Sequence, residues 1–171
     1  SNFYSETFIQ NSPLVAEENL VLWYLFDEGN LSQIYDFSGN QNHGTLQGGS
    51  FVPGKFSNSL KLEANDYLIA DGEWLSLTEP FTLSLWTKIL DDTSGILMRN
   101  GQFSLEYNED ATLSGRVYTN NGWAESKTRV PSGQWVQISL TYNGTLLSLF
   151  VNGQLEAEIN HEGYLSWGDG T

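Results

Sequence analysis

The stretch that decides the fold is Trp135–Asn160, which reads WVQISLTYNGTLLSLFVNGQLEAEIN. Apolar side chains occupy every second position of its first run: Val136, Ile138, Leu140 and Tyr142. Such alternation predicts a strand with one buried face. Asn143-Gly144 and Asn152-Gly153 divide the stretch, and an Asn-Gly pair is a strong signal for a hairpin turn. The stretch therefore predicts three antiparallel strands, at Trp135–Tyr142, Thr145–Val151 and Gln154–Asn160.

The same kind of pattern continues toward the N-terminus. Further runs expected to form strands are Leu20–Phe26, Leu60–Glu63, Tyr67–Ala70, Phe81–Ile89, Gln102–Asn108 and Leu113–Thr119. The first is nearly all apolar, which suits a strand buried on both faces, whereas the last three alternate. Asn120-Asn121-Gly122 predicts another hairpin turn, and no helical periodicity of useful length is present. About a dozen short strands predict an all-β fold, a two-layer antiparallel sandwich.

Length, charge and cysteine content narrow the possible functions. The chain has 171 residues, enough for one domain with a single core. Lys and Arg number 7 against 21 Asp and Glu, a formal charge of −14, which repels phosphate backbones and disfavours nucleic acid as a partner. An acidic surface suits cations such as calcium, or neutral ligands such as glycans. There is no cysteine, which excludes disulfides and thiolate sites, and no apolar run approaches the ~18 residues of a membrane span.

The pattern divides the chain into an arm and a sandwich. Residues 1–18 are weakly patterned and are expected to form an N-terminal arm or linker that could add a strand through Phe3–Ile9. Residues 19–171 are expected to form the sandwich. Because the chain opens at Ser1 without Met or a basic leader, it has the features of a processed or excised piece.

Several runs taken together resemble a known family. They are Leu22–Gly29, Asp36–Gly44, Phe81–Lys88, Gly133–Tyr142 and Leu149–Gly153. In this order and spacing they resemble the laminin-G-like modules of the concanavalin A-like lectin/glucanase superfamily, over residues 19 to 165. The resemblance implies a jelly-roll sandwich, a bound calcium ion, and glycan binding, adhesion or an accessory role in secreted and surface proteins. Members usually continue past the equivalent of Tyr164–Thr171 with a closing strand, and this sequence stops before it. Either that strand was trimmed or another segment fills its place, for which Phe3–Ile9 is a candidate, and the expected metal site does not rely on a ligand from it.

The candidate metal site is the loop Asp36–Gly44. Calcium binds six to eight oxygens from carboxylates, amides and backbone carbonyls. The expected ligands are Asp27, Asp36, Asn40, Asn42 and the backbone oxygen of His43. The alternative is a turn in which Asp36 and Asn40 only satisfy backbone amides, and the sequence leaves both readings open.

The candidate ligand site lies on outward strand faces. Sugars bind where aromatic rings stack on their C–H faces and polar groups take their hydroxyls. The residues expected to line it are Trp86, Arg99, Glu106, Asn108, Arg116, Tyr118 and Trp123. They form one patch only if their strands are neighbours in one sheet. The alternatives are burial of Trp86 under a loop and a plain ion pair between Arg116 and Glu106. Trp23 and Trp135 are expected to pack at strand ends, whereas the role of Trp167 is left undecided.

Catalysis is not expected. Glycoside hydrolysis needs two carboxylates that face the scissile bond, and hydrolases of this superfamily have a Glu-x-Asp-x-Glu run, which is absent here. Glu156 and Glu158 share a strand face that alternation predicts to be solvated. The predicted function is a non-catalytic, lectin-like adhesion module of an extracellular or cell-surface protein, with a structural calcium. The alternative is a protein-interaction or structural module of a surface assembly, without a sugar site.

Overall fold

A computed structural model describes residues 19–27, 29, 32–70, 77, 80–90 and 94–168. The arm predicted over residues 1–18 therefore lies outside the described residues. Within the described residues the regular structure is β-strand, and every strand pair is antiparallel. No helix among these residues is long and apolar enough to cross a membrane. The chain divides into two compact units, Ser1–Trp74 and Leu75–Thr171.

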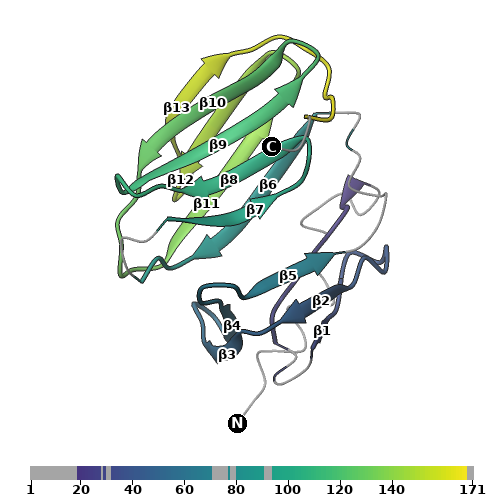
Figure 1. Ribbon diagram of the computed structural model, residues 1–171, viewed down its shortest axis with the longest axis vertical. Coiled ribbons are helices and arrows are strands. Elements are labelled where there is room, and N and C mark those ends of the chain that lie inside the picture. Colours follow the sequence, from purple (N-terminus) through teal and green to yellow (C-terminus); the bar gives the residue numbers. More distant parts are fainter. Residues whose placement is uncertain are drawn as a thin grey trace. The chain divides into compact units, whose positions relative to one another are not determined.

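The second unit is a two-layer sandwich of two four-stranded sheets (Figure 1). One sheet has the order β10 (Gly122–Arg129), β9 (Thr112–Thr119), β8 (Phe103–Tyr107) and β7 (Gly95–Arg99). The other has the order β13 (Gln154–Asn160), β12 (Leu146–Val151), β11 (Val136–Tyr142) and β6 (Phe81–Thr87). The all-β antiparallel sandwich predicted from alternation is confirmed.

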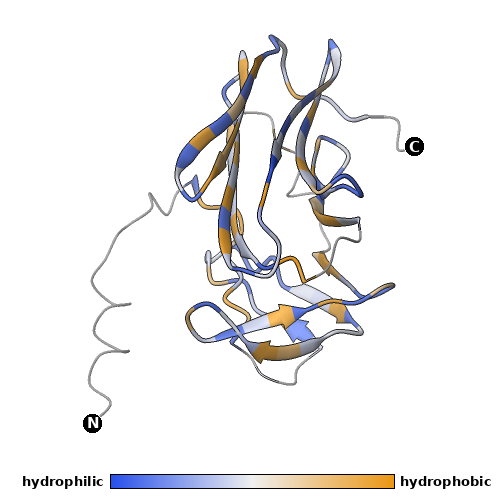
Figure 2. Ribbon diagram, turned by 90° about the vertical axis from the view of Figure 1, so that its left-hand side faces the viewer, coloured by the Kyte–Doolittle hydropathy of each residue, from blue (hydrophilic) through white to orange (hydrophobic). Residues whose placement is uncertain are grey.

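The core of this sandwich consists of the inward side chains of both sheets. Leu105, Leu113 and Val117 from one sheet are fully buried together with Ile138, Leu140 and Leu149 from the other. Along the strands, hydrophilic and hydrophobic residues alternate (Figure 2). The sheets approach so closely that a Cβ added to Gly115 of β9 would lie 2.4 Å from Leu140 Cδ1.

The predicted hairpin turns are present in this unit. Asn152 and Gly153 join β12 to β13, and both have positive φ, 51° and 79°, as a type I′ turn requires. Asn120 and Asn121 join β9 to β10, and Gly122 follows them with φ 93°. These turns determine the register, and the register determines which residues face outward.

The first unit is a smaller β structure. A three-stranded sheet has the order β1 (Gln33–Ile34), β2 (Gly44–Gln47) and β5 (Tyr67–Ala70), and a separate hairpin pairs β3 (Ser50–Pro53) with β4 (Asn58–Lys61). The strand expected at 60–63 thus lies two residues earlier, whereas the one expected at 67–70 is confirmed.

The buried strand predicted over Leu20–Phe26 is wrong. This segment has a single isolated bridge, Tyr24 to Asp36, and Trp23 is 46% exposed instead of packed at a strand end. The reason is that side chains of the following loop, not a neighbouring strand, bind much of its backbone: Asp36 accepts from the Trp23 amide, and Asn42 donates to the Val21 carbonyl. Trp135, by contrast, is half-buried immediately before β11.

Candidate functional site

The outward face of the sheet β7–β10, here called the outer face, brings most of the predicted ligand residues together. Arg116 of β9 lies opposite Glu125 of β10 and Ser104 of β8, and Ser104 lies opposite Arg99 of β7. Directly opposed residues of antiparallel strands share one face of the sheet. The outer face therefore includes Arg99, Glu106, Asn108, Arg116, Tyr118 and Trp123.

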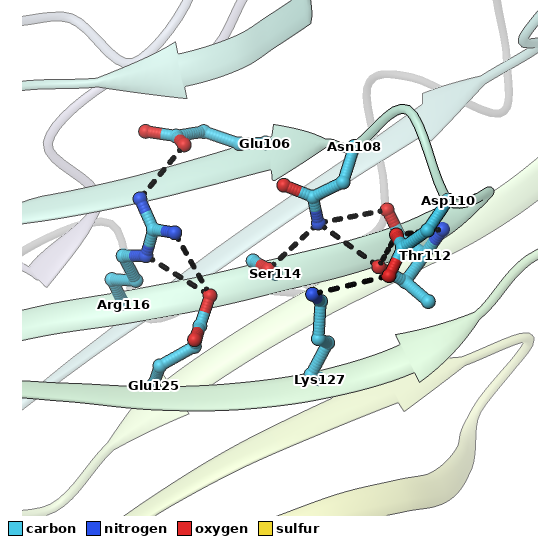
Figure 3. A network of polar contacts seen from close by, with 8 residues as sticks. All are labelled: Glu106, Asn108, Asp110, Thr112, Ser114, Arg116, Glu125 and Lys127. Carbon is cyan, nitrogen blue, oxygen red and sulfur yellow. Dashed lines mark hydrogen bonds and ion pairs between the residues drawn. The ribbon is translucent and has the colours of Figure 1, made fainter. Parts of the chain in front are cut away.

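Arg116 is the centre of an ion-pair network (Figure 3). Its Nη1 donates to Glu106 Oε2 at 2.9 Å, and its Nη2 and Nε donate to Glu125 Oε1 at 2.9 and 3.1 Å. Burial alone would raise the pKa of Glu125, but hydrogen bonds from Ser114 and Arg116 outweigh it and leave that pKa below its usual value. One guanidinium thus holds two carboxylates at fixed positions on the outer face.

Amide, hydroxyl and charged groups continue this network along the strands. Asn108 Nδ2 donates to Ser114 Oγ at 2.8 Å and to the Thr112 carbonyl at 3.0 Å. Lys127 Nζ lies 3.4 Å from Asp110 Oδ2, and Arg129 Nη1 donates to the Asp110 carbonyl at 3.2 Å. Figure 3 shows most of these side chains on neighbouring strands of one sheet.

Aromatic rings gather at the opposite end of β9. Tyr118 and Trp123 lie opposite each other, with ring centroids 4.9 Å apart and planes inclined at 57°. A Cβ added to Gly168 would lie 2.7 Å from Trp123 Cζ2, and one added to Gly101 would lie 2.3 Å from Trp167 Cε3. Both indoles thus pack on glycine backbone, yet Trp123 stays 50% and Trp167 53% exposed. We call Tyr118, Trp123 and Trp167 the aromatic cluster.

Backbone hydrogen bonds attach the segment that includes Trp167 to the sheet. The Ser166 amide donates to the Tyr118 carbonyl at 3.1 Å, and the Gly168 amide donates to the Gly101 carbonyl at 2.7 Å. Leu165 also forms a bridge with Thr119. These contacts place Trp167 beside the outer face although it is far from β9 in the sequence.

Trp86 does not share this face. It lies on β6, in the other sheet, where its strand neighbours Leu83 and Leu85 pack against the core. Because Trp86 points the other way and is 41% exposed, it projects from the opposite side of the sandwich. The single patch that included Trp86 is therefore wrong, as is its burial under a loop, because alternation assigns residues to faces but not strands to sheets.

Asp36, one of the candidate metal ligands, accepts hydrogen bonds from the chain at both of its carboxylate oxygens. Its Oδ1 accepts from the amides of Trp23 and Ser38, both at 2.9 Å. Its Oδ2 accepts from the Ser38 hydroxyl at 2.7 Å and the Asn42 amide at 3.0 Å. Burial would raise the pKa of Asp36, but these hydrogen bonds outweigh it and lower that pKa.

The other candidate ligands also make structural contacts. The side-chain amides of Asn40 and Asn42 donate to the carbonyls of Leu20 and Val21, His43 Nδ1 accepts from the Asp36 amide, and Asp27 Oδ1 accepts from the Asn58 amide. Among the described residues no group of three or more His, Cys, Asp or Glu converges as a metal site. Both oxygens of the Asp36 carboxylate accept hydrogen bonds from the chain, so a calcium ion bound there would replace at least one of them. Asp36 accepts from backbone amides as in the alternative, a turn, whereas the Asn40 side chain donates to the Leu20 carbonyl.

Comparison with known protein families identifies the family of this chain. The family model for laminin G-like domains, described as the concanavalin A-like lectin/glucanases superfamily, matches residues 62–171. The chain belongs to this superfamily. A comparison with curated proteins found no match.

Two solved structures have a fold similar to that of this chain. Domain 4 of AbnA, an extracellular GH43 arabinanase from Geobacillus stearothermophilus solved with arabinotriose, is similar with a TM-score of 0.66 and 17% identity, over 87% of this chain and 79% of that one. An S-layer domain-containing protein from Clostridium thermocellum is similar with a TM-score of 0.54 and 21% identity, over 81% of this chain and 71% of that one. The identities are low, so these similarities establish the superfamily fold alone.

Sequence reasoning missed two parts of the outer face in this superfamily member. Glu125, which holds Arg116, lies at an outward position of β10 and could have been found from the alternation around the Asn120-Asn121-Gly122 turn. Trp167 had no such signal, because it follows the last strand and only its contact with Gly101 reveals its place.

Proposed function

We propose that this domain binds a carbohydrate without acting on it, through its outer face. The single observation that supports this most is the aromatic cluster: Trp123 and Trp167 are half-exposed, fixed against glycine backbone, and next to a face of charged and amide groups. Rigid rings offer an apolar surface to the C–H faces of a sugar at little entropic cost.

The polar groups of the outer face would orient the bound sugar through hydrogen bonds to its hydroxyls. Glu106 and Glu125 accept hydrogen bonds and Arg116 donates them, and their mutual ion pairs fix all three before a ligand arrives. A sugar hydroxyl can both donate and accept, so it can bind beside either partner. Because such a site is open to water, we expect a dissociation constant of roughly micromolar to millimolar.

The carboxylates of this face favour binding over hydrolysis. A glycosidase needs one carboxylic acid whose pKa is raised so that it can protonate the leaving oxygen. The pKa of Glu125 is lowered instead, despite its burial, by Ser114 and Arg116, and Glu106 binds the same guanidinium. We therefore propose that the domain is not an enzyme.

We further propose an extracellular or cell-surface setting, with adhesion as one use of the binding. Two proteins with a similar fold support this: one is an extracellular arabinanase and one an S-layer domain-containing protein. Arabinan is accordingly a sensible first probe, next to other polysaccharides.

The test compares two tryptophans of similar exposure on opposite sheets. Trp123→Ala should weaken binding to a polysaccharide selected from a glycan array by about tenfold or more, while Trp86→Ala should leave it unchanged. Affinity electrophoresis or calorimetry measures both, with circular dichroism as the check on folding. Equal losses in the two variants, or an array without any signal, would refute the proposal.

The structural calcium expected from the resemblance is a separate proposal, and no step of binding depends on it. Calcium at ~100 times its dissociation constant would stabilise the fold by about 2.7 kcal/mol, which a melting curve detects. A melting temperature that is the same in calcium and in chelator would refute the calcium proposal.

A further inference from the structure

The basic residues of this acidic chain are gathered on the outer face. The whole sequence has 7 Lys and Arg against 21 Asp and Glu. Four of the basic side chains belong to the strands of this one sheet: Arg99, Arg116, Lys127 and Arg129. A concentration of cations on one face usually indicates an anionic ligand.

Here, however, two of those four cations, Arg116 and Lys127, already pair with carboxylates of the protein. Arg116 lies between the carboxylates of Glu106 and Glu125, at 2.9 Å from each. Lys127 pairs with Asp110, and Arg129 donates to the Asp110 carbonyl. Arg99 and Arg129 are the two cations of this face for which the described residues provide no ion pair.

The charge at the centre of the face is in fact negative. One guanidinium and two carboxylates sum to one negative charge, and the pKa of Glu125 is lowered by its hydrogen bonds from Ser114 and Arg116 against the effect of burial, so it stays ionised at neutral pH. A carboxylate or sulfate brought to Arg116 would meet Glu106 and Glu125 at once, because both carboxylates lie within one hydrogen-bond length of the guanidinium. A neutral hydroxyl meets no such repulsion.

We propose that the outer face selects uncharged glycans and rejects uronic-acid and sulfated ones, with the carboxylates of Glu106 and Glu125 as the residues that enforce the selection. This inference rests on the proposed function. It extends that function to a substrate class: neutral polysaccharides, held by ring stacking on Trp123 and Trp167 and by hydroxyl contacts to the Arg116 network.

A first experiment uses the wild-type domain and a panel of probes. Neutral arabinan, xylan and hydroxyethyl cellulose are compared with polygalacturonate, alginate and heparin by affinity electrophoresis. Binding should be confined to neutral members, and the affinity should change by less than about threefold between ~50 mM and ~500 mM salt, since few charges are exchanged. Binding only to an acidic member overturns the inference but leaves carbohydrate binding intact, whereas no binding to any member overturns both.

A second experiment reverses the selection. The double variant Glu106→Gln and Glu125→Gln keeps the size of both side chains and leaves Arg116 without its counter-charges. We expect it to gain binding to polygalacturonate by about tenfold or more, with strong salt dependence. The matched control is Glu156→Gln with Glu158→Gln, which changes the net charge equally on β13 of the other sheet and should gain nothing.

The outcomes of this pair are distinct. Equal gains in both variants would assign the effect to overall charge and overturn the role of the Arg116 network. No gain in either would overturn it as well, provided that circular dichroism shows both variants folded. If the Glu106 and Glu125 variant does not fold, the wild-type panel and its salt dependence still decide the selectivity.

Discussion

Asp36→Asn tests whether the loop Asp36–Gly44 is held by hydrogen bonds or by a metal. The carboxylate is buried and accepts four hydrogen bonds, from the amides of Trp23, Ser38 and Asn42 and from the Ser38 hydroxyl. Asparagine has almost the same shape but replaces one acceptor oxygen with an NH2 donor. The substitution therefore changes hydrogen bonding and leaves packing nearly unchanged.

The expected cost follows from the two oxygens separately. If the Asn oxygen takes the place of Oδ1, it keeps the amides of Trp23 and Ser38. The NH2 then takes the place of Oδ2, where the Ser38 hydroxyl can turn to accept, but the Asn42 amide, 3.0 Å from Oδ2 in the wild type, faces another donor. One buried amide without an acceptor costs about 1–3 kcal/mol. We expect a loss of that size in the free energy of unfolding the first unit.

Hydrogen exchange measures this loss locally. The amides of Trp23, Ser38 and Asn42 should exchange faster in Asp36→Asn, while the core amides of β9 and β11 should not change. If hydrogen bonds alone hold the loop, the result is the same in calcium and in chelator. An effect seen only in calcium would refute the hydrogen-bond account and support a metal at Asp36.

The pH dependence of stability is a second measurement of the role of Asp36. Hydrogen bonds from Ser38, Trp23 and Asn42 outweigh burial and lower the pKa of Asp36 in the folded state. Its contribution to stability is therefore fully present above the unfolded value of about 3.9 and is lost as the pH falls through the lower folded value. Asp36→Asn should remove this acid sensitivity. A variant that is as acid-sensitive as the wild type would contradict the assignment.

Three further predictions concern the cores of the two units. Gly115→Ala would place a Cβ 2.4 Å from Leu140 Cδ1, and we expect urea denaturation to give a loss of about 1–3 kcal/mol from overpacking. Ser126→Ala removes a buried hydroxyl without a hydrogen-bond partner and should be neutral or stabilising by up to about 1 kcal/mol. Ser114→Ala instead breaks the bonds to Asn108 and Glu125 and should cost about 1–3 kcal/mol. Burial, and then the charge of Asp36, raise the pKa of Tyr24 to about 12, so an absorbance titration should show a tyrosine that ionises only near that pH and is missing in Tyr24→Phe.

Each of these has a clear contrary result. An unchanged unfolding free energy for Gly115→Ala would mean that the Leu140 side chain can move aside at no cost. Equal losses in the two serine variants would mean that the Ser126 hydroxyl has a partner after all. A tyrosine signal near pH 10 that disappears in Tyr24→Phe would contradict its burial.

Local sequence determined most strands of the second unit and the faces of their residues, although β7 and β10 were not among the runs expected to form strands. Alternation placed Val136, Ile138 and Leu140 inward and Arg116 and Tyr118 outward, as the structure has them, because the side chains of a strand point alternately to its two faces whatever the strand pairs with. The Asn-Gly turns determined which strands pair in each hairpin, because a tight turn joins two strands that are adjacent in the sequence.

The first unit was less predictable. Leu20–Phe26 has the composition of a buried strand, yet Asp36, Asn40 and Asn42 bind its backbone instead of a neighbouring strand. Composition indicates that a segment avoids water, but it does not say which groups satisfy its amides and carbonyls.

Only the tertiary structure decided which residues meet on the outer face. It assigned Trp86 to the opposite sheet, packed Trp167 on Gly101, and attached the backbone of residues 166–168 to Tyr118 and Gly101. Sheet membership and the path of the terminal segment depend on contacts between residues far apart in the chain, and a periodicity of two residues contains no information about such contacts. The sequence by itself determined a β-sandwich with a polar outward row, and the packing of distant segments made part of that row a candidate binding site.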